Sequence, residues 1–231
     1  MSSPHLLPQE KTGFQTKPEM LALAHAKSSL RIGIPKESTL QENRVALVPH
    51  SVHNLVARGH QVIIESGAGE KSNFSDHEYS EAGAEIQPSR EIVFQSNVIL
   101  KVAPPTLDEI QLFSPNQILI SPMHLPVINA DYIQALRLKR VTALAMEYMQ
   151  SEDNSFPIVR IMSEIAGLAV IHTAAELLSN SKQGKGVLLG GISGVPPAKV
   201  VILGAGVVAE YATRAAVALG ASVRIFDDQI H

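Results

Sequence analysis

Residues 200–209 read Val-Val-Ile-Leu-Gly-Ala-Gly-Val-Val-Ala, an apolar strand pattern that runs directly into Gly-x-Gly-x-x-Ala. Gly204 permits a tight turn, Gly206 lets a pyrophosphate approach the backbone, and Ala209 permits close packing of a helix on a strand. A helical pattern follows over 210–219, so its N-terminus would face the phosphates. The stretch predicts a Rossmann-type dinucleotide site. The alternative is a glycine turn needed only for packing.

The strand pattern at 222–226 leads into Asp227, which lies about 20 residues after the first glycine, as in dinucleotide-binding motifs. A carboxylate at this place accepts hydrogen bonds from both ribose hydroxyls and repels a 2′-phosphate. We therefore expect NAD rather than NADP as the cofactor, with Asp227 on the ribose. The adjacent Asp228 is a second candidate for the same role.

Strand and helix patterns alternate along the chain before this motif. Apolar strand patterns fall at residues 30–35, 61–65, 98–102, 117–120 and 141–145. Helical patterns fall at 49–58 and 75–82, the second with Ser75 and Glu78 in a capping-box arrangement. The alternation predicts an α/β fold, with a flavodoxin-like parallel-sheet substrate domain followed by an incomplete Rossmann NAD(P)-binding domain. Ligands of such sheets bind at the carboxyl ends of the strands.

We expect three parts in the chain. Residues 1–29 are polar and interrupted by prolines, which predicts a flexible tail. Residues 30–152 form the predicted substrate domain and 153–231 the first part of the NAD-binding domain, because the segment 151–157 is polar and ends at a proline. Apolar residues at helical spacing predict one long helix over 163–179.

Composition excludes several classes of function. A net charge of -3 without long like-charge blocks, and only 4% aromatic residues, argue against binding of nucleic acid or anionic membrane. The absence of cysteine excludes disulfides and thiolate metal sites, and the histidines show no metal-ligand spacing with nearby carboxylates. We find no signal-peptide core and no stretch of bilayer-spanning length, so we expect a cytoplasmic protein with small-molecule partners and no metal.

Three cationic side chains are candidates for chemistry at the carboxyl ends of these strands. Arg44 suits recognition of a small carboxylate through its planar fork, although such an arginine is more often a surface ion-pair partner. Lys101 interrupts an apolar strand, where a lysine requires a counter-charge or a ligand. His124 follows the strand at 117–120 and can exchange protons near neutral pH, although a random histidine is more often a surface or capping residue.

Several motifs in order resemble the family of alanine dehydrogenases and pyridine nucleotide transhydrogenase alpha subunits. They lie at 31–37 (RIGIPKE), 42–49, 65–69 (ESGAG), 79–85, 162–167 (MSEIAG), 186–191 and 195–200 (VPPAKV). The resemblance is strongest to the dehydrogenases, since Lys101 and His124 are usually absent from the transhydrogenase branch. It implies reversible, NAD-dependent oxidative deamination of L-alanine to pyruvate and ammonia, in a homo-oligomer.

The resemblance also implies roles for individual residues. Arg44 would hold the substrate carboxylate, Lys101 would bind the carboxylate or polarise the carbonyl, and His124 would act as general acid and base. Ser163 would contact the cofactor phosphates and Asp227 the ribose. Two places depart from the family pattern: Pro104-Pro105 stands where a Glu-Pro pair is common, and Leu168 stands where an arginine is frequent.

A family member continues past the second strand of the Rossmann domain with further strands and a catalytic aspartate. One β-α-β unit does not cover both faces of a sheet, so residues 199–231 are expected to be poorly packed or held by another chain. This leaves two alternatives to a dehydrogenase. One is the nucleotide-binding domain of a proton-translocating NAD(P) transhydrogenase alpha subunit with a membrane partner, and the other is a fragment that associates without catalysis.

Overall fold

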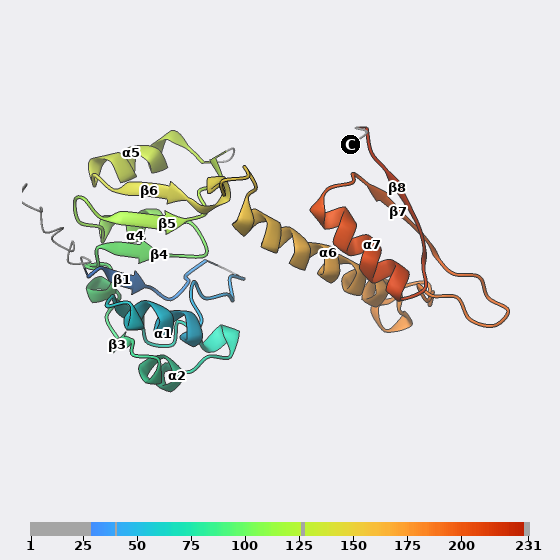
Figure 1. Ribbon diagram of the computed structural model, residues 1–231, viewed down its shortest axis with the longest axis horizontal. Coiled ribbons are helices and arrows are strands. Elements are labelled where there is room, and N and C mark those ends of the chain that lie inside the picture. Colours follow the sequence, from blue (N-terminus) through green and yellow to red (C-terminus); the bar gives the residue numbers. More distant parts are fainter. Residues whose placement is uncertain (1–28, 40, 126–127, 229–231) are drawn as a thin grey trace, which may run out of the picture.

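The computed structural model describes residues 29–39, 41–125 and 128–228 (Figure 1). The predicted tail, residues 1–29, lies outside these ranges except for Ser29. The first group of strands is β1 Arg31–Ile34, β2 Gln61–Glu65, β3 Glu85–Gln87, β4 Val98–Leu100, β5 Ile118–Ser121 and β6 Thr142–Ala145. The helices between them are α1 Pro49–Ala57, α2 Asp76–Glu81, α3 Arg90–Val93, α4 Leu107–Gln111 and α5 Ala130–Leu138, with short 3-10 helices η1 Glu70–Ser72 and η3 Met146–Tyr148.

These strands form one parallel six-stranded sheet in the order β3-β2-β1-β4-β5-β6. The predicted parallel α/β fold is confirmed. The six strands follow the classic doubly wound order 3-2-1-4-5-6, so the predicted flavodoxin-like sheet has one strand more than expected, β3, which extends the sheet beyond β2. The sequence pattern did not predict β3, because only Ile86 among its three residues is apolar.

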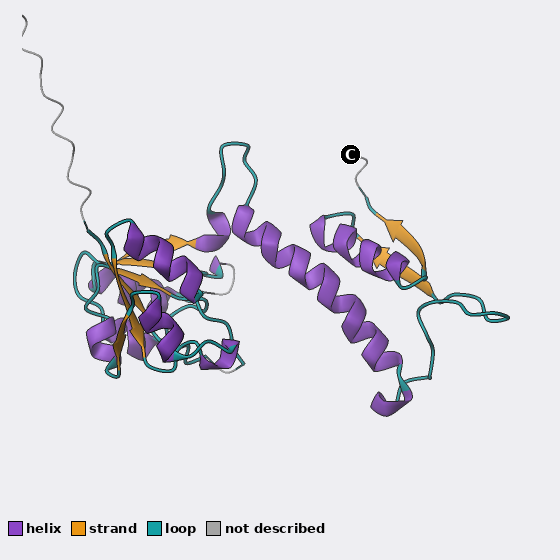
Figure 2. Cartoon of the chain, turned by 60° about the horizontal axis from the view of Figure 1, so that its bottom comes forward, coloured by secondary structure: helices purple, strands orange, loops and turns teal. Residues whose placement is uncertain are grey.

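Helices cover both sides of this sheet (Figure 2). One buried cluster joins Ile34 of β1 and Ile64 of β2 to Val52 of α1 and Tyr79 of α2. A second joins strands β4 and β5 to helices α4 and α5 through Ile99, Leu119, Ile110 and Leu136. The predicted capping box of α2 is confirmed, since the Ser75 side chain and Glu78 bond reciprocally. The sheet is thus a buried platform that fixes where its end loops begin.

The strand order reverses at the neighbouring strands β1 and β4, where Ile32 lies opposite Val98 and Gly33 opposite Ile99. Open α/β sheets bind ligands at the carboxyl ends of the strands at such a reversal. The chain leaves this end of β1 at Pro35 and this end of β4 at Lys101. Lys101 remains anchored to the sheet, because its backbone N–H donates to Ile120 at 3.0 Å.

The 22-residue helix α6, Pro157–Leu178, runs from the six-stranded sheet to the second sheet (Figure 2). It begins at Pro157 rather than at 163, because a proline at the first helical position lacks only an N–H that would have no helical partner. The expectation that no stretch reaches bilayer-spanning length is therefore wrong: α6 is long and apolar enough by length and composition alone. The limits 30–152 and 153–231 of the two domains stay a prediction.

The second sheet contains two parallel strands, β7 Lys199–Leu203 and β8 Ser222–Phe226, with α7 Val207–Ala218 between them in sequence and η4 Asn180–Lys182 after α6. Both strand predictions are confirmed. Helix α7 begins earlier than the predicted 210, because Gly206 takes an extended conformation and serves as its N-cap.

Helix α7 packs closely on α6 at Gly167, where an added Cβ would lie 2.5 Å from the carbonyl oxygen of Val208. One face of the β7–β8 sheet packs on α7 through Val200 and Ile202. The other face leaves Leu203 82% and Phe226 57% exposed. The expected incomplete packing of this unit is therefore found on one face only.

Candidate active site

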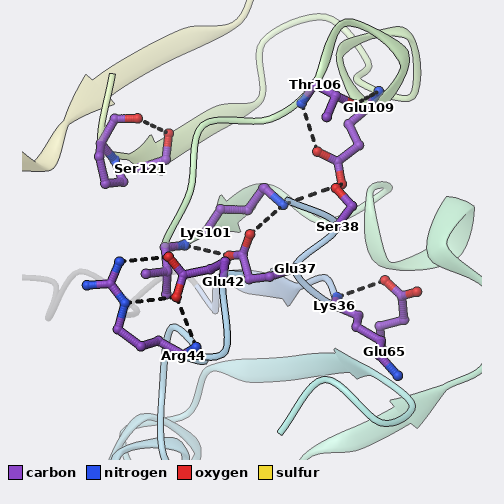
Figure 3. Close-up of polar contacts among 12 residues, drawn as sticks. Lys36, Glu37, Ser38, Glu42, Arg44, Glu65, Lys101, Thr106, Glu109 and Ser121 are labelled. Carbon is purple, nitrogen blue, oxygen red and sulfur yellow. Dashed lines mark hydrogen bonds and ion pairs between the residues drawn. The ribbon is translucent and has the colours of Figure 1, made fainter. Parts of the chain in front are cut away.

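Lys101 is fully buried at the end of β4 and is held between two carboxylates (Figure 3). Its Nζ lies 2.9 Å from Glu37 Oε2 and 3.4 Å from Glu109 Oε1. Both glutamates are themselves buried. The counter-charge that a lysine in an apolar strand requires is therefore present, and two carboxylates provide it.

Further hydrogen bonds hold these two carboxylates in place. Glu37 Oε1 accepts from the backbone N–H of Val102 at 2.6 Å. Glu109 accepts from the Ser38 hydroxyl at 2.9 Å and from Arg90 Nη1 at 3.2 Å. Glu109 also closes the capping box of α4, accepting from the backbone N–H of Thr106 at 2.9 Å. The network thus links the loops that follow β1 and β4.

The network continues to β2 through Arg90. Its guanidinium lies 3.1 Å from Glu65 Oε2 and donates to the carbonyl oxygen of Lys36 at 3.0 Å. Sequence reasoning missed Glu37, Glu109 and Arg90 as members of the site. The available signals were the capping-box spacing of Thr106 and Glu109 and the position of Glu37 just after β1.

Arg44 is half exposed and forms an ion pair with Glu42. Arg44 Nε and Nη2 donate to the two oxygens of Glu42 at 2.8 and 2.7 Å. This hydrogen bond is the largest influence on the Glu42 carboxyl and holds its pKa below the ordinary value. Arg44 Nη1 lies 3.5 Å from Met162 Sδ on α6. The hydrogen bonds to Glu42 raise the pKa of Arg44, and the negative charge of the nearby Glu37 raises it further. Arg44 thus lies beside the buried ion network.

His124 lies in the loop after β5 with a positive φ of 50°. Its backbone N–H and that of Met123 donate to the Glu147 carboxylate at 2.7 and 3.0 Å. Burial raises the pKa of Glu147, but hydrogen bonds from its own backbone and from those of Met123 and His124 outweigh burial and hold the pKa below the ordinary value. The side chain of His124 is exposed. Within the described residues no hydrogen bond or ion pair joins it to Arg44 or Lys101, although parallel strands place all three at the same edge of the sheet.

The predicted cofactor residues lie together at the second sheet. Ser163 of α6 lines a cavity of about 570 Å³ with Gly204, Gly206 and Ala209. Gly204 has a φ of 96°, a conformation that favours glycine, and an added Cβ at Gly204 or Gly206 would meet nothing within 4 Å. The N-terminus of α7 has no side-chain cap. An open glycine turn with free helical N–H groups fits a pyrophosphate, so the residues present fit NAD.

Asp227 lies directly after β8 and is tied to the glycine turn. Its carboxylate accepts a hydrogen bond from the backbone N–H of Ala205. The carboxylate is exposed. Asp227 and the glycine turn are therefore neighbours, an arrangement typical of dinucleotide-binding motifs.

Residues 33–166 match the family described as Alanine dehydrogenase/PNT, N-terminal domain, and residues 169–231 match Alanine dehydrogenase/PNT, C-terminal domain. The alanine dehydrogenase of Methanococcus maripaludis is 45% identical over 197 residues, which cover 85% of this chain and 52% of that protein.

Solved structures of the same family also match this chain. An L-alanine dehydrogenase matches with a TM-score of 0.83 at 41% identity, covering 87% of this chain and 55% of that one. The transhydrogenase from Sinorhizobium meliloti matches with a TM-score of 0.76 at 30% identity, covering 86% of this chain and 57% of that one. The chain spans about half the length of the relatives it matches. With both domain types of the family present in order, the chain belongs to the alanine dehydrogenase/PNT family.

Proposed function

We propose that this chain carries the substrate site and the first part of the cofactor site of an NAD-dependent alanine dehydrogenase. The reaction is the reversible oxidative deamination of L-alanine to pyruvate and ammonia. The observation that carries the proposal is the gathering of Arg44 and Lys101 at one sheet edge, in a chain 45% identical to a protein named alanine dehydrogenase.

Arg44 holds the substrate carboxylate. A guanidinium offers paired parallel N–H donors that match the two oxygens of a carboxylate, and the Arg44 side chain is 52% exposed. Its position beside the buried ion network directs the rest of a small substrate toward the carboxyl ends of β1 and β4.

Lys101 supplies positive charge to the carboxylate or to the carbonyl oxygen of pyruvate. Its ammonium is balanced by Glu37 and Glu109, so it acts as a fixed charge inside the fold. Lys101 has no exposed surface, and a substrate therefore meets its ammonium only after a neighbouring side chain moves.

His124 acts as the general acid and base. Its exposed imidazole takes a proton from the substrate nitrogen or from water, and returns it in the reverse direction. Glu147 fixes the backbone from which this imidazole projects. A bound NAD would supply the acceptor for the hydride that leaves the α-carbon of alanine.

The turn at Gly204 and Gly206 and the start of α7, where Ala209 allows the helix to approach β7, would hold the pyrophosphate of NAD. Ser163 contributes a hydroxyl to the phosphates, and Asp227 accepts hydrogen bonds from the ribose hydroxyls. Selectivity for NAD over NADP follows from repulsion between Asp227 and a 2′-phosphate.

The partners in this proposal are L-alanine or pyruvate and further copies of the same chain, in the cytoplasm, without nucleic acid or a membrane. The exposed apolar side chains of α6, which include Ile161, Ile165 and Leu168, support association through this helix. Measurement of the molecular mass in solution tests this, with a monomer for wild type counting against it.

The match to a transhydrogenase structure at 30% identity favours one alternative, the nucleotide-binding part of a transhydrogenase. A steady-state assay separates the two. Alanine-dependent formation of NADH by the purified, folded chain supports the dehydrogenase. Hydride exchange between nucleotides without a response to alanine supports the transhydrogenase, and no activity of either kind supports a chain that associates without catalysis.

A further inference from the structure

The contact between Glu42 and Arg44 uses one whole edge of the guanidinium. Arg44 Nε donates to Glu42 Oε1 at 2.8 Å and Nη2 donates to Oε2 at 2.7 Å. The backbone N–H of Arg44 adds a third bond to Oε1 at 2.9 Å. The Glu42 side chain is only 13% exposed, against 52% for Arg44. The Glu42 side chain is therefore largely enclosed, while about half of the Arg44 side chain stays exposed.

The second edge of the same guanidinium, formed by Nη1 and Nη2, is not bound by Glu42. A guanidinium has five N–H donors, and the Glu42 carboxylate uses the one on Nε and one on Nη2. Within the described residues, the contact of Nη1 is with Met162 Sδ at 3.5 Å, and a thioether is a weak acceptor. The edge formed by Nη1 and Nη2 has the same paired geometry as the edge that Glu42 occupies, so it can hold a second carboxylate.

We infer that Glu42 is a positioning residue, which pins one edge of Arg44 and presents the other edge to the substrate carboxylate; this rests on the proposed function of Arg44. A free arginine side chain loses rotamer entropy when it is fixed. Glu42 fixes it before the substrate arrives, so less is lost on binding.

The same contact has an opposite interpretation, in which Glu42 occupies the place of the substrate carboxylate and must be displaced. The two interpretations differ in sign. Weakening the hydrogen bonds from Arg44 to Glu42 reduces the affinity for substrate if Glu42 positions Arg44. It increases that affinity if Glu42 competes with the substrate carboxylate. Positioning is favoured because Glu42 is also bonded to the Arg44 backbone, which a substrate would not replace.

The test is the substitution Glu42→Gln in the full chain, with pyruvate as the probe and its Kd measured by calorimetry. Glutamine keeps the size of the side chain, but its amide nitrogen cannot accept a hydrogen bond. We expect the Kd to rise about tenfold, the size of one charge-assisted hydrogen bond. The matched control is Glu176→Gln, which makes the same change in the exposed pair with Lys182 and leaves the Kd within about twofold.

A spectroscopic signature separates positioning from loss of fold. In nitrogen-15 spectra of the wild type, the Arg44 Nε–H signal should be sharp and protected from exchange with solvent. In Glu42→Gln the same signal should be broadened, while the backbone signals keep their wild-type positions. An unchanged or lower Kd in Glu42→Gln, with wild type binding pyruvate, overturns the positioning role alone. Failure of the wild-type chain to bind pyruvate overturns both this role and the proposed function.

Discussion

Lys101 Nζ lies 2.9 Å from Glu37 Oε2, and both side chains are buried. Glu109 supplies a second carboxylate at 3.4 Å. Removing the cation leaves the buried Glu37 without an ion-pair partner and leaves Glu109 only its pair with Arg90, which is far more costly than losing an exposed pair. The ion network is therefore a structural element as well as a candidate for chemistry.

Lys101→Met should accordingly lower the free energy of unfolding by about 3–5 kcal/mol. Urea denaturation at neutral pH measures this. Adding Glu37→Gln to Lys101→Met should restore part of the loss, because the carboxylate that has lost its ion-pair partner is then neutral. Lys182→Met, which breaks the exposed pair with Glu176, should change stability by less than about 1 kcal/mol. A Lys101→Met variant as stable as wild type would contradict the network.

Glu147→Gln should destabilise the loop that carries His124 in a pH-dependent manner. Folding lowers the Glu147 pKa, so its contribution is fully present above the ordinary glutamate value of about 4.3 and is lost as the pH falls through the lower folded value. We expect a difference of roughly 1 kcal/mol at neutral pH, because the carboxylate is partly exposed. Unfolding of both proteins at a series of pH values tests this, and a difference that persists unchanged below about pH 4 would oppose it.

Gly204→Ala should weaken NADH binding about tenfold or more. The φ of 96° strains any residue with a Cβ, so the turn must change, at a cost of about 1–2 kcal/mol. Gly194→Ala is the matched control, since Gly194 also has a positive φ of 83° with nothing near its Cβ but does not line the cavity at α7. Fluorescence titration with NADH should separate the variants; equal affinities would count against a phosphate turn at Gly204.

Asp227→Ser should reduce the preference for NADH over NADPH. The substitution removes the charge that repels a 2′-phosphate and the acceptors for both ribose hydroxyls. We expect the ratio of the two Kd values to fall about tenfold, whereas Asp228→Ser should leave it within about twofold. A larger effect at Asp228 would assign the ribose to that residue instead.

The parts of the fold that sequence predicted are those set by local pattern. The strands at 61–65 and 199–203 contain continuous apolar runs, the strand at 222–226 is mostly apolar apart from Ser222 and Arg224, and the capping box at Ser75 is a local exchange of hydrogen bonds. Strand β3 was missed because its hydrogen bonds to β2, rather than its own side chains, make it a strand.

In the candidate site, too, the features set by local sequence could be predicted and those set by tertiary contacts could not. Burial of Lys101 and its need for a counter-charge follow from one apolar strand. That Glu37 and Glu109 provide the charge depends on β1 and β4 being neighbours and on the turn into α4, which no local pattern fixes. Glu42 and Arg44 are only two residues apart in sequence. The backbone conformation between them nevertheless decides which edge of the guanidinium the Glu42 carboxylate binds.

The most direct test of the account is the rate of alanine-dependent NADH formation by wild type and by His124→Ala. Removing the general acid and base should lower kcat by about a hundredfold or more. The Kd for pyruvate should change by less than about threefold, because Arg44 and Lys101 are untouched. Alanine oxidation at the full wild-type rate in His124→Ala would contradict the proposed chemistry, as would a folded wild-type chain that forms no NADH from alanine.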